Sequence, residues 1–129
     1  MATLHLGFLA SHSGSNIQSI IDSIKKKLLD AEPCVIISNN SKAYVLERAK
    51  IENIPSYHIS SIKYPVQEQL DNAIIEHLEK HGVDTIVLAI VLRKKPVFAF
   101  SFSRVRQLFD YGIKVLGSGL LIAVYTKIR

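Results

Sequence analysis

Short apolar runs alternate along the chain with segments in which apolar residues recur every three or four positions. The runs are typical of buried strands, and they cover residues 4–10, 34–37, 57–59 and 85–89. The recurring patterns are typical of amphipathic helices, and they occupy residues 16–27, 42–52 and 65–81. This alternation predicts an α/β fold, in which a parallel, Rossmann-like sheet has right-handed crossovers and helices on both faces.

Finer features of these elements also follow from the residues. Glu32 and Pro33 are expected to end the connection before the second strand, and the polar turn at residues 38–41 is suited to cap the helix that follows it. Gly82 stands where a glycine commonly ends a helix. The expected inward positions are Tyr44, Leu46 and Ala49 in the second helix and Val66, Leu70, Ala73, Ile74, Ile75 and Leu78 in the third. The expected solvent-facing positions are Glu47 and Arg48 in the second helix and Gln67, Glu68, Asp71, Glu76, Glu79 and Lys80 in the third.

The loop after the first strand joins small residues to the start of a helix. Helix N-termini carry unpaired N–H groups and the positive end of the helix dipole, and both attract anions. Gly14 allows close backbone approach, and Ser15 and Asn16 add side-chain donors. The loop therefore predicts a phosphate site at Ser13, Gly14, Ser15 and Asn16, although a Ser/Gly turn also occurs without a ligand. Neither G-x-G-x-x-G nor G-x-x-x-x-G-K-[ST] is present, which disfavours an ordinary dinucleotide or nucleoside triphosphate site.

Four blocks in order carry a resemblance to a known family. They are A-S-H-S-G-S-N-I-Q-S-I-I (10–21), I-S-N-N-S-K-A-Y-V-L-E-R-A (37–49), I-P-S-Y-H-I-S (54–60) and H-G-V-D-T-I-V-L-A (81–89). Over residues 4–93 the chain resembles the phosphoribosylglycinamide formyltransferases of purine (IMP) biosynthesis. The resemblance implies formyl transfer from 10-formyltetrahydrofolate to a glycinamide amine, with the phosphate of the phosphoribosyl substrate bound in the first loop.

The resemblance weakens where the fourth strand ends. Family members have Ala-Gly, an aromatic residue, an apolar residue and Arg there, lining the folate pocket. This chain keeps Ala89, Leu92 and Arg93 but has Ile90 and Val91 at the glycine and aromatic positions. Leu92 and Arg93 are therefore weak candidates for the folate and substrate pocket. Because ligands bind beyond the carboxyl ends of parallel strands, residues 11–16 and 89–93 are expected to share one rim.

Residues 94–129 form a divergent basic tail without the family's catalytic motif. That motif, N-x-H-P-[SA]-L-L-P followed later by Asp, would supply the acid–base and oxyanion groups. From residue 93 onward there is no His or Asn, and the only acid is Asp110, in a Phe-Asp-Tyr-Gly stretch that is typical of a turn. We therefore assign no catalytic residue and expect a truncated, catalytically incomplete chain. Two explanations stay open: a shifted reading frame beginning near residue 93, or a replaced ending that adds one or two strands around β-prone residues 99–103 and 120–125.

Charge and residue types limit the partners. Residues 1–92 hold 8 Lys/Arg and 10 Asp/Glu, a balance of −2, whereas residues 93–129 hold 8 Lys/Arg and one acid, a balance of +7. The basic character thus belongs to the tail and not to the domain, which disfavours nucleic acid as a partner. The resemblance implies a small phosphoribosyl substrate instead, and an exposed apolar surface on a poorly packed tail would lead to self-association. The single cysteine, Cys34, excludes an internal disulfide, and the histidines show no metal-ligand spacing. Without a signal peptide or an apolar run of spanning length, a cytoplasmic location and no membrane partner are expected.

Three classes of function fit these observations. The first is the phosphoribosyl-binding half of a formyltransferase. The second is a non-catalytic phosphosugar- or nucleotide-binding α/β module, and the third is an interaction protein that docks through its basic, aromatic tail. Binding of a phosphoribosyl substrate and of a folate would separate the three.

Overall fold

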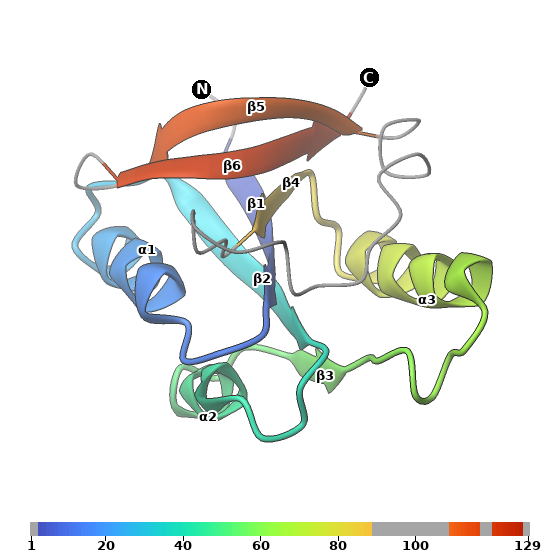
Figure 1. The fold of residues 1–129 in the computed structure, drawn as a ribbon. Helices are drawn as coiled ribbons and strands as arrows, with labels where there is room; N and C mark the ends of the chain where they lie inside the picture. The colour runs from blue at the N-terminus through green and yellow to red at the C-terminus, as the bar shows by residue number, and fades with distance from the viewer. Residues whose placement is uncertain (1–2, 89–108, 117–119, 128–129) are drawn as a thin grey trace.

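One mixed sheet organises the protein. The computed structural model describes residues 3–88, 109–116 and 120–127, and it describes side chains in the first of these ranges. The strands are β1 (Leu4–Ala10), β2 (Ala31–Ser38), β3 (Ser56–His58), β4 (Thr85–Leu88), β5 (Phe109–Leu116) and β6 (Leu120–Lys127). Their order in the sheet is β3-β2-β1-β4-β6-β5 (Figure 1). The first four strands are parallel, and β5 and β6 form an antiparallel hairpin whose β6 runs antiparallel to β4. The predicted parallel α/β sheet is therefore confirmed.

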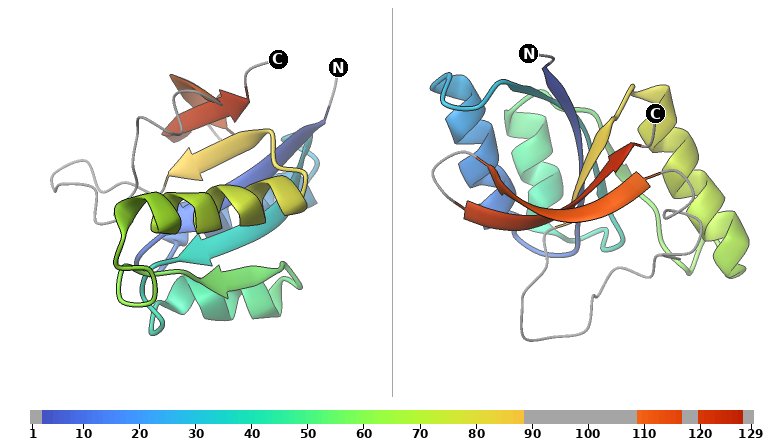
Figure 2. Two further views of the ribbon diagram at one scale, coloured as in Figure 1. Left: turned by 90° about the vertical axis from the view of Figure 1, so that its right-hand side faces the viewer. Right: turned by 90° about the horizontal axis from the view of Figure 1, so that it is seen from above.

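Three helices cover the parallel part of the sheet on both faces. They are α1 (Ser15–Lys25), α2 (Tyr44–Ile51) and α3 (Gln67–Lys80). Helices α1 and α2 lie on one face and α3 lies on the other, in front of the strands in the left view of Figure 2. Gly82 follows the end of α3 with a φ of 69°, a left-handed conformation that favours glycine. In the part of the chain that is described, no helix has the length and apolar character needed to cross a membrane.

The hydrophobic core has two halves, separated by the sheet. Because successive strand residues point to opposite faces, Ile36 packs with the α1 and α2 side, whereas Val35 and Ile37 pack with the α3 side. The amphipathic pattern predicted for residues 16–27 agrees with the burial of Ile17, Ile20 and Ile21 in α1. The two halves together hold the parallel strands in place, so the loops at the strand ends are built on a rigid scaffold.

The connection into the second strand was assigned incorrectly from the sequence. Pro33 lies inside β2 and pairs with Leu6, and the next pair joins Gly7 to Val35, so Cys34 is an extra, bulged residue. Strand β3 pairs with β2 only from Ile36 onward. At Pro33 the strand therefore has a single described neighbour, and a missing N–H is tolerated at such an edge or bulge.

Helix α2 is rotated relative to the sequence-based expectation. Tyr44 was expected to pack inward but is 51% exposed, while Val45 and Ala49 are fully buried. Tyr44 instead lies beside Arg48, whose guanidinium carbon is 4.9 Å from the ring centroid. Arg48 is only half-buried and not simply solvent-facing, because it also contacts the first loop. The polar turn before α2 forms, but the N-cap residue is Ala43, and no side chain caps the helix.

Two positions at the start of α3 also differ from expectation. Val66 is the residue before the first turn and is 54% exposed, so it does not belong to the buried stripe. Asp71 was expected to face solvent but is only 3% exposed, and its Oδ1 accepts a hydrogen bond of 2.9 Å from Gln67 Nε2. The other stripe residues, Leu70 to Leu78, are buried as predicted.

The tail contributes strands to the sheet. The predicted β-prone run at residues 120–125 is confirmed by β6, whereas residues 99–103 lie outside the described part. Asp110 does not form a turn but lies in β5, paired with Thr126. These pairings agree with the explanation in which the ending adds strands, and the reading frame itself stays a question for the coding DNA.

Candidate anion-binding site

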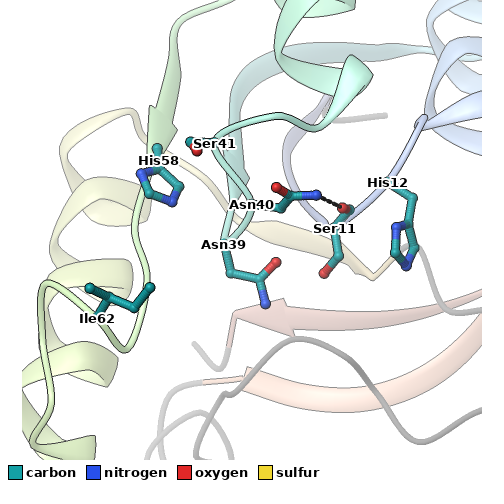
Figure 3. Close-up of a pocket in the computed structure, with 7 residues that line it drawn as sticks. All are labelled: Ser11, His12, Asn39, Asn40, Ser41, His58 and Ile62. Carbon is teal, nitrogen blue, oxygen red and sulfur yellow. Dashed lines mark hydrogen bonds between the residues drawn. The ribbon is translucent and has the colours of Figure 1, made fainter.

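The candidate site lies where parallel strands end. Strands β1, β2 and β3 finish at Ala10, Ser38 and His58, and the segments around these ends line an open pocket of about 400 Å³ (Figure 3). The described residues that line it are Ser11, His12, Asn39, Asn40, Ser41, His58 and Ile62. No carboxylate is among them, and the side chains are mostly hydrogen-bond donors or acceptors. The carboxyl edge of a parallel sheet is the usual ligand position in this fold class, so both the place and the lining suit a polar or anionic ligand.

The first loop is held by hydrogen bonds from the α2 side. Three successive carbonyl oxygens, those of residues 11–13, accept hydrogen bonds. Ser11 O accepts from Asn40 Nδ2 at 3.2 Å, a bond drawn in Figure 3. His12 O accepts from Val45 N at 3.1 Å, and Ser13 O accepts from Arg48 Nε at 2.5 Å. These bonds satisfy the carbonyl groups of the loop within the protein and fix its path into α1.

Gly14 is required by the geometry of this loop. Its φ is 72°, in the left-handed region, where residues with a side chain are strained. A Cβ at this position would overlap Val45 Cγ2 and lie 2.9 Å from Val45 Cβ. The glycine thus allows the loop to pack against α2. This packing explains Gly14 whether or not a phosphate binds beside it.

Behind Gly14, the first turn of α1 presents its N–H groups without a side-chain cap. The first intrahelical donor is Gln18 N, which donates to Gly14 O at 2.9 Å. No side chain caps this end, and the first turn contains no acidic residue. Ser13, Ser15 and Asn16 are exposed. Such a helix start, with unpaired N–H groups and an uncompensated dipole, is able to hold an anion.

The predicted site residues and the pocket residues are neighbours in the chain. Ser13, Gly14, Ser15 and Asn16 lie together at the start of α1, directly after the pocket residues Ser11 and His12. His12 is exposed and lines the pocket. Residues 89–93, including Leu92 and Arg93, lie outside the described residues. Whether they share this rim stays a prediction.

Sequence reasoning missed the residues that come from the second and third strand ends. Asn39, Asn40 and Ser41 follow β2, and His58 ends β3. The rule that ligands bind beyond strand carboxyl ends would have found them, because the polar turn was already evident in the sequence. The role of Arg48 carried no such signal, since its bond to Ser13 depends on how α2 packs.

Other reactive residues lie away from this pocket. Within residues 3–88, no group of three His, Cys, Asp or Glu side chains is arranged to hold a metal ion. Burial, followed by the negative charges of Glu32 and Asp84, raises the pKa of the Cys34 thiol, which favours the unreactive protonated form. Neither observation indicates a metal site or a reactive thiol among the described residues, and the anion-type site at the end of β1 is the candidate that we consider further.

A Rossmann-like sheet with a polar pocket at its carboxyl edge defines a class of α/β proteins in which ligands bind at that edge. The formyl transferase family profile matches residues 4–97, most of the chain, and the chain belongs to this family. The phosphoribosylglycinamide formyltransferase of Bacillus subtilis is 34% identical over 84 residues, which are 65% of this chain and 43% of that protein. The trifunctional purine biosynthetic protein adenosine-3 of Chironomus tentans is 40% identical over 90 residues, 68% of this chain and 7% of that protein.

Solved structures agree in fold. Glycinamide ribonucleotide transformylase 1 from Symbiobacterium toebii superposes with a TM-score of 0.66 at 34% identity, covering 76% of this chain and 48% of that chain. The phosphoribosylglycinamide formyltransferase of Coxiella burnetii, solved with CHES, gives a TM-score of 0.71 at 26% identity, covering 91% of this chain and 55% of that one. The chain thus spans about half the length, or less, of these relatives.

Proposed function

We propose that the chain is the phosphoribosyl-binding half of a phosphoribosylglycinamide formyltransferase of purine biosynthesis. The observation that carries the proposal is the uncapped start of α1, held by α2 within the region that matches the formyl transferase family. The implied reaction moves a formyl group from 10-formyltetrahydrofolate to the glycinamide amine. A cytoplasmic location, as expected for a soluble purine-pathway enzyme, is part of this proposal.

The substrate phosphate would bind at Ser13, Gly14, Ser15 and Asn16. Backbone N–H groups would supply most of the donors, and the exposed Ser15 and Asn16 side chains would add to them. The Arg48 guanidinium, bonded to Ser13 O, would add positive charge behind the loop and keep it in position. Among the described residues that line the adjacent pocket, none carries a carboxylate that would repel the anion.

Catalysis is not assigned to any residue of this chain. Residues 94–129 contain no His or Asn. The pocket for the folate that donates the formyl group would involve Leu92 and Arg93, which lie outside the described residues. Positioned acid–base and oxyanion groups each contribute about 10²-fold or more to turnover. We therefore expect the purified chain alone to show formyl transfer near background. Turnover of roughly 1 s⁻¹ or more would contradict this expectation and point to catalytic groups elsewhere.

Calorimetric titration with inorganic phosphate and with phosphoribosylglycinamide tests the binding proposal. We expect both to bind, the second more tightly, and amide NMR shifts to concentrate at residues 13–16. Ser15→Ala should weaken binding by about 1.5–3 kcal/mol, the value of a hydrogen bond to a charged group. Ser19→Ala is the matched control, because Ser19 lies one turn further along α1 and its hydroxyl bonds Ser15 O.

A second pair of variants tests the support from α2. Arg48→Gln and Lys50→Gln each remove one positive charge from the same helix, but Lys50 contacts only Glu47, at 3.4 Å, among its described salt-bridge partners. We expect Arg48→Gln to weaken phosphate binding at least several-fold and Lys50→Gln to leave it unchanged. A folded protein that binds neither ligand would refute the proposal. Phosphate binding without any preference for the phosphoribosyl compound would favour the non-catalytic module.

A further inference from the structure

Strand β5 forms one edge of the sheet. It is eight residues long, and β6 is its one neighbour within the described part of the chain. An edge strand presents a row of N–H and C=O groups that can pair with another strand. Natural edges are usually protected by proline, by short length or by repelling charges. The sequence of β5, Phe-Asp-Tyr-Gly-Ile-Lys-Val-Leu, contains no proline, and its two charges are of opposite sign.

The positions of these charges specify a partner. Asp110 and Lys114 are placed symmetrically about Gly112. If two β5 strands pair antiparallel about a two-fold axis at Gly112, Asp110 stands opposite Lys114 of the partner subunit, and Lys114 stands opposite Asp110 of the partner subunit. Opposite charges at directly facing positions stabilise an antiparallel pair, and like charges destabilise it. The strand is thus complementary in charge to a second copy of itself.

The remaining positions fit the same register. In it, Phe109 stands opposite Val115 of the partner subunit and Tyr111 opposite Ile113 of the partner subunit. Pairs of an aromatic and a β-branched residue are favourable neighbours across strands. Gly112 stands opposite Gly112 of the partner subunit, where the backbones meet without side chains. A shift of the register by two residues would separate both charge pairs, so the sequence favours one alignment.

We propose that two copies of this chain associate edge to edge through β5, in the antiparallel register centred on Gly112. The two six-stranded sheets would then form one continuous sheet across the two-fold axis. The site at the start of α1 belongs to the loop after β1, and three strands, β4, β6 and β5, follow β1 in sheet order toward this edge. The association therefore does not depend on the proposed phosphate site.

Charge reversal tests the register. In sedimentation velocity, Asp110→Lys and Lys114→Asp should each raise the dimer Kd about tenfold or more, because each places like charges opposite one another twice per dimer. The double variant should restore dimerisation. Glu79→Lys, an equivalent reversal on the exposed surface of α3, is the matched control and should leave the Kd unchanged. A monomeric wild-type chain, or a double variant no better than the single ones, would overturn the proposal.

Disulfide trapping tests the same register by the proximity of facing residues instead of by charge reversal. In a Cys34→Ser background, Gly112→Cys should cross-link two copies under mild oxidation, because facing residues of antiparallel strands have Cα atoms about 4.5–5.5 Å apart. Lys114→Cys should not, since its counterpart would be displaced by four residues, roughly 13 Å along the strand. Cross-linking through residue 114 but not residue 112 would overturn the register. Circular dichroism would confirm that each variant is folded.

Discussion

Replacing Gly14 by alanine should destabilise the protein more than replacing a glycine of similar conformation elsewhere. Two costs arise at this position. The φ of 72° is strained for a residue with a side chain, at about 1–2 kcal/mol. The new Cβ would also collide with the side chain of the fully buried Val45, and overpacking of a core typically costs about 1–3 kcal/mol. The sum, about 2–5 kcal/mol, is a large part of the about 5–15 kcal/mol that stabilises a typical domain.

Gly82 is the matched control for the torsional cost. Its φ is 69°, but no heavy atom lies within 4 Å of the position that a Cβ would occupy. Gly82→Ala should therefore cost only the conformational part, about 1–2 kcal/mol. The difference between the two variants isolates the collision between the loop and α2.

Urea unfolding followed by circular dichroism measures both effects. For a slope of about 1–3 kcal/mol per molar urea, Gly14→Ala should lower the midpoint by about 1 M or more. The double variant Gly14→Ala/Val45→Ala should be less destabilised than the sum of its single variants, by about 0.5–3 kcal/mol, because Val45→Ala removes the overlapping Cγ2 and leaves only the 2.9 Å contact with the Cβ of residue 45. If Gly14→Ala costs no more than Gly82→Ala, or if the double variant is additive, the packing of Gly14 against Val45 is not what requires the glycine.

Three further predictions concern other parts of the chain. Burial raises the pKa of Asp84, but hydrogen bonds from the His5 N–H, the His5 ring and the Thr85 hydroxyl outweigh it and leave this pKa below its ordinary value. These hydrogen bonds stabilise the fold fully above about pH 3.9, and this stabilisation is lost as the pH falls through the lower folded-state pKa. Asp84→Asn should therefore weaken the dependence of the unfolding free energy on pH in the acid range, as measured by urea unfolding. Burial, together with nearby positive charge, lowers the pKa of His81, whose Nε2 lies 2.8 Å from the Tyr57 hydroxyl. If the Tyr57 hydroxyl donates to the neutral ring, Tyr57→Phe removes this bond and should raise the pKa of His81 in an NMR titration. An unchanged pKa would show that the hydroxyl does not favour the neutral ring. If the tail results from a frame shift, one of the two other frames downstream of codon 93 should encode N-x-H-P-[SA]-L-L-P, and its absence from both would make the tail native.

The parallel part of the fold could be predicted because its signals are local. Each strand is a short apolar run, each helix has an apolar stripe, and Gly82 marks a helix end. The errors arose where distant contacts decide the structure. Pro33 is tolerated in β2 because β3 begins to pair only further along. Asp110 has the local sequence of a turn but is held in a strand by pairing with β6.

The candidate site likewise has one part that local sequence signals predict and another part that tertiary contacts decide. The loop at residues 13–16 could be found from the sequence, since small residues before a helix are a local signal. Helix α2 could not be oriented, because it has only eight residues and its buried positions depend on which side meets the loop. Burial of Val45 against Gly14 turns Tyr44 outward and brings Arg48 to the Ser13 carbonyl. The supporting residues of the site therefore become visible only with the tertiary contact.

This contact couples the stability of the loop to any ligand that it holds. The carbonyl groups of residues 11–13 are bonded to the segment from Asn40 to Arg48, and Gly14 packs on Val45 of the same segment. A substitution at Gly14 would change phosphate binding through the position of the loop even if the glycine never touched the ligand. Loss of binding in such a variant is thus no proof of a direct contact. Substitutions at the exposed Ser15, which leave this packing intact, are the ones that can distinguish a ligand contact from support of the fold.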